Sequence, residues 1–175
     1  MSNCIRSTPL VLLPGLMCDE HLWRHQIDYF SPHREVRALS LVGANTMAEL
    51  AQHLLQEAPA KFVLAGLSMG GILAFEVYRQ APERVVALAL LDCTYLPDTP
   101  EKVERRNRQI DDVRQGLLRQ VIQDELRPNY LAYSQAEDQA LLDEIMRMGM
   151  DLGAGAFVSQ SEALRDRADS SDTLP

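Results

Sequence analysis

The sequence predicts an α/β fold: a doubly wound, mostly parallel sheet, followed by a helical second half. Two observations support this prediction. Strand-like and helix-like segments alternate through the first half of the chain, whereas the second half shows helical periodicity and no convincing strand. Strands that alternate with helices form βαβ units, whose right-handed crossovers build a parallel sheet with helices on both faces.

Four apolar segments of the first half have the composition of buried strands. They are residues 10–13, 35–41, 62–65 and 85–91. The first is ended by Pro14-Gly15, a strong turn signal. We expect these strands in the spatial order 2-1-3-4. That order brings the loops after the first and third strands together at the topological switch point of the sheet, where ligands bind in open α/β folds.

Helices are predicted between these strands. Residues 19–30 carry apolar side chains at helical spacing. The helix before the third strand opens with Thr46-x-x-Glu49, a capping-box pattern. Residues 69–80 form the helix that follows the third strand. Each helix therefore occupies the place of a crossover in a parallel sheet.

The composition changes near residues 97–100, and we expect residues 1–96, 97–165 and 166–175 to differ in role. The first range has the alternating pattern of an α/β core, the second that of a set of helices, and the third is a short polar stretch. One amphipathic stripe is predicted at Val103, Ile110, Val113, Leu117, Val121 and Ile122, a second at Leu141, Leu142, Ile145 and Met146, and a weaker third at Phe157, Ser161 and Leu164. Such helices pack on a surface or form a lid.

Composition and charge exclude several classes of partner. The 175 residues are 46% hydrophobic, enough to bury one core, and the net charge of −8 argues against nucleic acid. The apolar run at residues 9–17 is too short to span a membrane. Three widely spaced cysteines, Cys4, Cys18 and Cys93, favour reduced thiols and a cytoplasmic location.

The run Gly66-Leu67-Ser68-Met69-Gly70 lies where a predicted strand ends and a predicted helix begins. A serine on such a sharp strand-to-helix turn adopts a strained backbone conformation. Glycines at 66 and 70 remove side chains that would collide within the turn, and Gly71 lets the helix approach the sheet. The spacing of these glycines does not fit a phosphate-binding loop. A glycine-rich turn without chemistry is the structural alternative.

This arrangement resembles the nucleophile elbow of the α/β-hydrolase family. The resemblance covers residues 8–93 with specific motifs and the helical remainder more loosely. It implies that residues 97–165 are a helical cap inserted after the fourth strand and that residues 166–175 begin a return to the core. It implies that Ser68 is the nucleophile of a serine hydrolase that needs no cofactor and no metal. It also implies an oxyanion hole made by the backbone N–H groups of Leu16 and Met69. Leu16 follows Pro14-Gly15, where the family usually has His-Gly.

A base and an acid for Ser68 are missing from the expected positions. In this family the acid and then the histidine follow the nucleophile, yet all four histidines here precede Ser68. The resemblance therefore implies that the acid and histidine belong to a C-terminal segment outside these 175 residues, and that this chain alone is inactive. Two residues within the chain are alternative candidates: Asp92 for the acid and His21 for the base. His21 and His25 could also form a metal-binding pair, but no third ligand accompanies them.

The function implied by the resemblance is hydrolysis of a small ester, thioester or lactone through an acyl intermediate on Ser68. The partner is then a small-molecule acyl substrate, without nucleic acid or membrane, and the sequence says nothing about oligomeric state. Two alternatives stay open. One is an acyltransferase or cofactor-free perhydrolase that uses the same serine. The other is a non-catalytic binding protein of the same fold.

Overall fold

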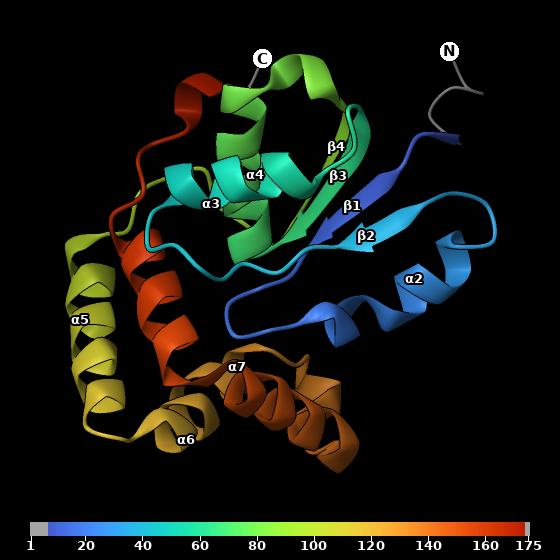
Figure 1. Ribbon diagram of the computed structural model, residues 1–175. Helices are drawn as coiled ribbons and strands as arrows, with labels where there is room; N and C mark the ends of the chain where they lie inside the picture. The colour runs from blue at the N-terminus through green and yellow to red at the C-terminus, as the bar shows by residue number, and fades with distance from the viewer. Residues whose placement is uncertain (1–6, 174–175) are drawn as a thin grey trace.

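The computed structural model describes residues 7–173, so Cys4 and the last two residues of the predicted return segment lie outside the described part. Its sheet has four parallel strands in the order β2-β1-β3-β4, as predicted (Figure 1). The strands are β1 (Leu10–Leu13), β2 (Val36–Ala38), β3 (Phe62–Leu67) and β4 (Val85–Leu91). Leu13 of β1 lies opposite Gly66 of β3, which sets the two carboxyl ends side by side.

The sheet carries helices on both faces because side chains of a strand alternate between its two sides. Val11 and Leu13 of β1 pack in the core beneath α3 (Met47–Glu57) and α4 (Met69–Gln80). Leu10 and Leu12 point to the opposite face. There they pack with Trp23, which precedes α2 (Arg24–Phe30). The fold is therefore a doubly wound α/β sheet.

Several element boundaries differ from the prediction. The predicted helix at 19–30 is a 3-10 turn (Glu20–Trp23) followed by α2, because Asp19 caps the turn by accepting a hydrogen bond from the His21 N–H. The strand predicted at 35–41 is only three residues long. The capping box is confirmed: Thr46 Oγ1 accepts from the Glu49 N–H at 3.2 Å.

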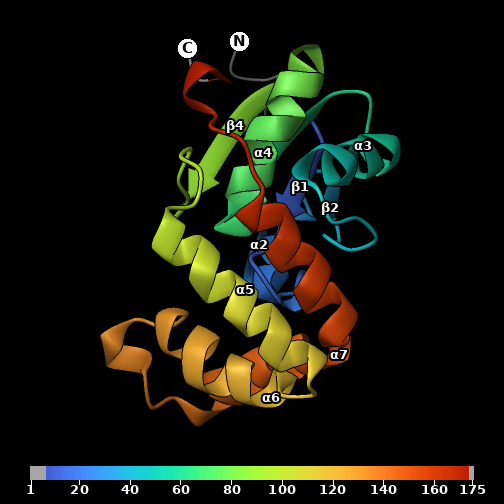
Figure 2. The same ribbon diagram turned by 90° about the vertical axis from the view of Figure 1, so that its left-hand side faces the viewer.

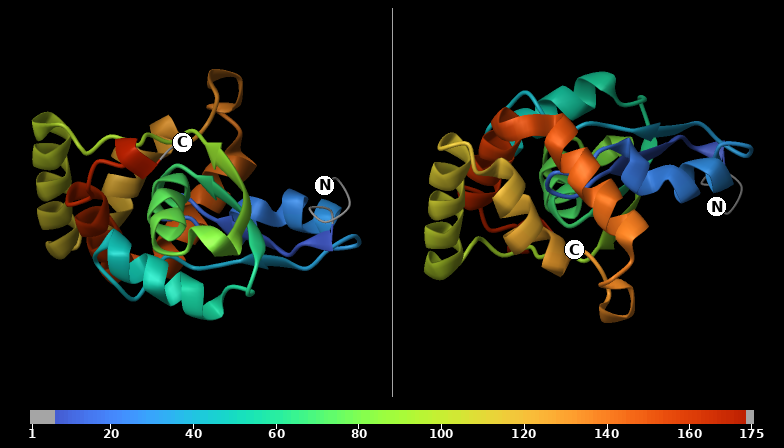
Figure 3. Two further views of the ribbon diagram at one scale, coloured as in Figure 1. Left: turned by 90° about the horizontal axis from the view of Figure 1, so that it is seen from above. Right: turned by 90° about the horizontal axis from the view of Figure 1, so that it is seen from below.

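The second half of the described chain is helical, as predicted. Its elements are α5 (Pro100–Arg114), α6 (Leu118–Val121), a π-helical turn (Ile122–Leu126), 3-10 turns (Arg127–Asn129, Tyr133–Gln135), α7 (Gln139–Arg165) and a final 3-10 turn (Ser171–Thr173). Residues 97–165 are called the cap below. The strands point their carboxyl ends toward the cap (Figures 1 and 2). The cap and α2 lie against different sides of this end, with α5 on the flank opposite α2 (Figure 3).

Two details of the cap prediction are wrong. The first predicted stripe is not continuous, because the chain turns at Gly116 (φ 93°) and Leu117 is 41% exposed. The second and third stripes lie on one helix, α7, which kinks at Gly153 (φ 80°). Phe157, Ser161 and Leu164 form the stripe predicted as weaker, yet all three are buried.

The cap has a hydrophobic cluster of its own, which also includes one residue of the core. Met17, in the loop after β1, is buried among Ile110 and Val113 of α5 and Phe157 of α7. The loop after β1 is thereby packed into the cap. Within residues 7–173, none of the helices has the length and apolar character needed to cross a membrane.

A buried ion-pair cluster joins the two ends of the cap. The Asp98 side chain is 1% exposed and lies 2.5 Å from Arg106 Nε and 2.8 Å from Arg167 Nη1. The Arg167 Nε–H also donates to the Leu96 carbonyl at 3.0 Å. Asp98 precedes α5 and Arg167 follows α7, so this cluster fixes where the cap leaves and rejoins the core.

We predict that Asp98→Ala destabilises the chain by about 3 kcal/mol or more, because it leaves buried guanidinium groups without their partner. Asp111→Ala is the matched control on α5: Asp111 is 70% exposed and lies 3.9 Å from Arg114. It should cost less than about 0.5 kcal/mol, as exposed pairs do. Urea unfolding measures both values, and equal losses would contradict the structural role of Asp98.

Candidate active site

Ser68 lies in a strained turn between β3 and α4. Its backbone has φ 52° and ψ −111°, a conformation that a residue with a side chain rarely adopts. The turn is held in place because the Ser68 N–H donates to the Leu91 carbonyl at 2.9 Å. The residue itself is exposed. These features are those of a strained strand-to-helix turn, and they leave Ser68 exposed at the carboxyl end of the sheet; its role as a nucleophile stays a prediction.

The glycines beside Ser68 are required by backbone contacts. A Cβ at Gly66 would lie 2.3 Å from the Gly70 carbonyl oxygen, and one at Gly70 would lie 2.3 Å from the Leu13 carbonyl oxygen. A Cβ at Gly71 would lie 2.7 Å from Cys93 Sγ. No side chain fits at the first two positions without moving backbone. The elbow therefore depends on glycine for steric reasons.

The loop after β1 approaches the elbow closely. A Cβ at Gly15 would lie 3.8 Å from the Cβ of Ser68, so this loop runs beside the nucleophile candidate. The next residue, Leu16, is half-buried. Within residues 7–173, the N–H groups of Leu16 and Met69 donate no hydrogen bond to a loop or neighbouring element. Their oxyanion role remains a prediction that this arrangement permits.

The electrostatic surroundings keep two thiols neutral and place Ser68 beside a helix N-terminus. α4 begins at Met69, so the partial positive charge of its N-terminus lies beside Ser68. Burial, followed by the negative charge of Asp19, raises the pKa of the Cys18 thiol to about 12. Burial and Asp92 likewise raise the pKa of Cys93. Both cysteines therefore stay protonated near neutral pH.

The structure shows no hydrogen bond between Ser68 and either alternative candidate, His21 for the base or Asp92 for the acid. His21 Nδ1 lies 3.0 Å from Asp19 Oδ1, and its imidazole is exposed. Asp92 follows β4 with φ 44° and is exposed. Neither is hydrogen-bonded to the Ser68 hydroxyl, for which the structure shows no hydrogen bond among residues 7–173. Across the same residues, no three His, Cys, Asp or Glu side chains are grouped to hold a metal ion.

Sequence reasoning missed two cap residues that contact the loop after β1. The Tyr130 hydroxyl donates to the Leu16 carbonyl at 2.7 Å. Gln160 of α7 is 1% exposed, and its Oε1 accepts from the Met17 N–H at 2.9 Å. A weak signal for Gln160 exists in the sequence, since this polar residue interrupts the most buried stripe of α7. Nothing local to Tyr130 identifies its partner.

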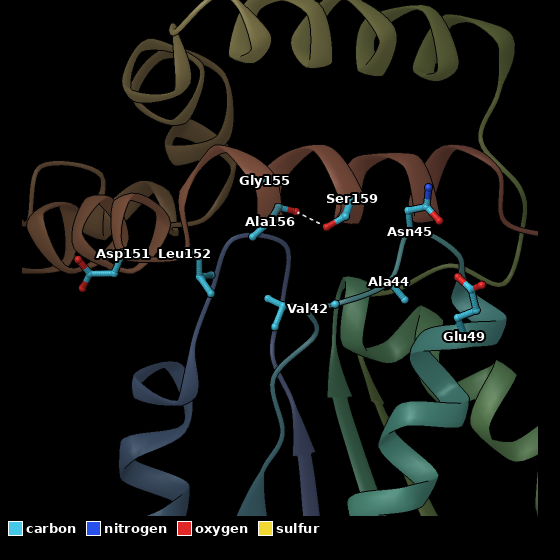
Figure 4. Close-up of a pocket in the computed structure, with 10 residues that line it drawn as sticks. Val42, Ala44, Asn45, Glu49, Asp151, Leu152, Gly155, Ala156 and Ser159 are labelled. Carbon is cyan, nitrogen blue, oxygen red and sulfur yellow. Dashed lines mark hydrogen bonds between the residues drawn. The ribbon is translucent and has the colours of Figure 1, made fainter.

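A hollow of about 700 Å³ lies away from the nucleophile candidate. It separates the loop between β2 and α3 from the second half of α7 (Figure 4). Its lining residues are Val42, Gly43, Ala44, Asn45, Glu49, Asp151, Leu152, Gly155, Ala156 and Ser159. Because Ser68 is not among them, this hollow is separate from the candidate active site.

Comparison with known sequences agrees with this geometry. The chain is 28% identical to the pimeloyl-[acyl-carrier protein] methyl ester esterase of Pectobacterium carotovorum, over 67% of this chain and 48% of that protein. It is 34% identical to the enzyme of the same name from Yersinia enterocolitica, over 45% of this chain and 34% of that protein. The matched region thus spans between a third and a half of these curated relatives.

Solved structures share the fold over most of the chain. An esterase from Thermogutta terrifontis superimposes with a TM-score of 0.82 at 26% identity, covering 96% of this chain and 67% of that one. An enol-lactonase from Burkholderia xenovorans LB400 gives a TM-score of 0.81 at 20% identity, covering 93% and 66%. Both are longer than this chain.

The family model of the thioesterase domain matches residues 20–164. This range includes the elbow around Ser68, the sheet from β2 onward and the cap helices as far as Leu164. Together with the strand order 2-1-3-4 and the structural neighbours, the match settles the family. The chain belongs to the thioesterase domain family and has the α/β-hydrolase fold.

Proposed function

We propose that the protein hydrolyses a small ester, thioester or lactone through an acyl intermediate on Ser68. The observation that carries the proposal is the strained, exposed Ser68 between β3 and α4. Strain of this kind persists only where the surrounding structure imposes it, and it is concentrated at functional sites. The names of the curated relatives, which are methyl ester esterases, support the same class of reaction.

The proposed reaction begins when Ser68 Oγ attacks the carbonyl carbon of the substrate and a histidine takes the hydroxyl proton. The carbonyl oxygen becomes negative and accepts hydrogen bonds from the Leu16 and Met69 N–H groups. Loss of one such donor costs about 2.7–4 kcal/mol of transition-state stabilisation. The alcohol or thiol then leaves with the proton. Water hydrolyses the acyl-serine in a second step, with the same histidine as base.

We propose that the acid and the histidine come from a segment outside these 175 residues. The exposed edge of the sheet supports this proposal: β4 is composed of apolar residues, yet Val86, Leu90 and Leu91 are 38%, 36% and 39% exposed. Strands of a parallel sheet are normally covered on both faces. The greater length of the structural neighbours fits the addition of further strands at this edge.

We also propose that the cap, residues 97–165, acts as a lid over the substrate. It lies at the carboxyl ends of the strands (Figure 2), the end at which Ser68 is exposed, and there it would supply walls for a substrate. The partner is then a small acyl compound. A cytoplasmic location remains a prediction from the reduced thiols of Cys18 and Cys93.

The first prediction concerns covalent labelling of Ser68. A fluorophosphonate probe reacts with a serine that a base activates. We expect the protein made from the full reading frame to be labelled at Ser68, as located by mass spectrometry of its peptides. Residues 1–175 alone should react more than about a thousandfold more slowly, because they lack the base.

Two variants make this labelling test specific. Ser68→Ala should abolish the label, whereas Ser159→Ala should keep it, since Ser159 donates to the Ala156 carbonyl in the separate hollow. The same experiment separates an enzyme from a non-catalytic binding protein of this fold. A folded full-length protein that is never labelled would contradict the hydrolase proposal and favour the binding protein.

The second prediction concerns the edge of the sheet at β4. Val86→Lys should change the unfolding free energy of residues 1–175 by less than about 1 kcal/mol, because this side chain is 38% exposed. In the full reading frame it should cost about 2 kcal/mol or more, since further strands would bury it.

Leu117→Lys is the matched control for this substitution. Leu117 is 41% exposed, but it lies in the cap rather than on the sheet edge. Its cost should be small in both proteins. Urea unfolding provides all four values. Equal costs of Val86→Lys in the short and long chains would argue against a segment that covers β4.

A further inference from the structure

The peptide group between Leu16 and Met17, in the loop after β1, is hydrogen-bonded to the cap through both its carbonyl and its N–H. The Tyr130 hydroxyl donates to the Leu16 carbonyl oxygen at 2.7 Å. The Met17 N–H donates to Gln160 Oε1 at 2.9 Å. The carbonyl of residue 16 and the N–H of residue 17 belong to the same planar unit. Two side chains from separate parts of the cap therefore fix the orientation of one plane.

The conformation of this loop needs such support. Met17 has φ 54°, in the left-handed region that a residue with a side chain rarely adopts. Such a conformation costs on the order of 1 kcal/mol or more and persists only where the surroundings impose it. The Met17 side chain is 1% exposed and packs in the cap cluster. Burial and the two hydrogen bonds together hold the strained residue.

The surroundings of Gln160 and Tyr130 fix which of their atoms donate and which accept in these hydrogen bonds. Gln160 Nε2 donates to the Leu41 carbonyl at 3.0 Å, so the amide cannot flip without losing both partners. Gln160 thus bridges the loops that follow β1 and β2. Burial raises the pKa of Tyr130 far above its usual range, so its hydroxyl keeps the proton that it donates to Leu16.

We propose that Tyr130 and Gln160 are positioning residues that hold the Leu16–Met17 peptide plane and thereby aim the Leu16 N–H at the substrate oxygen. This inference rests on the proposed oxyanion role of Leu16. The preceding residue, Gly15, lies beside Ser68, so fixing the next peptide plane determines how the loop continues past the elbow. The quality of the oxyanion hole then depends on the cap being docked on the loop.

We call the two hydrogen bonds from Tyr130 and Gln160 to the Leu16–Met17 peptide the clamp. Steady-state kinetics of the full-reading-frame protein with a p-nitrophenyl ester as substrate test its role. Tyr130→Phe and Gln160→Leu should each lower kcat by about tenfold or more, a smaller loss than removal of an oxyanion donor causes. KM should change by less than about twofold. Tyr133→Phe and Gln139→Leu are the matched controls. Tyr133 is 98% exposed, and Gln139 is exposed and bonds only to Asp143, so both controls should keep wild-type kcat.

Gln160→Glu separates positioning from space filling. A protonated carboxyl accepts from the Met17 N–H and donates to the Leu41 carbonyl, as the amide does, whereas the carboxylate has no proton to donate. Burial favours the protonated form. The kcat of Gln160→Glu relative to wild type should therefore approach one at low pH and fall as pH rises through the pKa of the new carboxyl. A ratio that is constant with pH would overturn the hydrogen-bonding role.

Amide hydrogen exchange of residues 1–175, followed by NMR, tests the clamp without any activity. The Met17 amide should be protected, and Gln160→Leu should speed its exchange by at least about tenfold. One outcome is that the wild-type full-reading-frame protein hydrolyses no ester, while Gln160→Leu still speeds exchange of the Met17 amide. The proposed function is then refuted, and only the effect of the clamp on the loop is supported. If the wild type is active and neither kcat nor exchange responds to the variants, the clamp is refuted while the function stands.

Discussion

The close approach of the α4 N-terminus to the ends of β1 and β3 is the constraint on which the site depends. The Cα of Gly70 passes so near the Leu13 carbonyl that a Cβ would lie 2.3 Å from its oxygen. This contact brings three groups together: the strained Ser68, the helix N-terminus and the loop after β1. A longer distance between helix and sheet would separate the serine from any N–H group contributed by that loop.

The cap and the core are less independent than the chain order suggests. Met17 of the core packs in the hydrophobic cluster of the cap. Tyr130 and Gln160 of the cap form hydrogen bonds with the same loop. Asp98 and Arg167 join the ends of the cap at its base. A displacement of the cap therefore has to disturb the loop beside Ser68. These contacts would couple the proposed lid to the proposed oxyanion hole.

The parts of the site that the sequence predicts are those determined by neighbours in the chain. The elbow around Ser68 and the capping box at Thr46 depend on residues within a few positions, so spacing alone identifies them. Gln160 lies 143 positions from its partner Met17, and only the packing of α7 brings the two together. The continuous stripe expected through Leu117 fails for the related reason that a turn at Gly116 redirects the helix.

A crystal structure of the full-reading-frame protein after reaction with a fluorophosphonate tests the central claim most directly. The phosphorus should be bonded to Ser68 Oγ, with one phosphoryl oxygen about 2.7–3.1 Å from the N–H nitrogens of both Leu16 and Met69. The histidine that we propose as the base should lie within hydrogen-bonding distance of Ser68 Oγ. A phosphoryl oxygen directed away from these two amides, or an adduct on another residue, would contradict the proposed site.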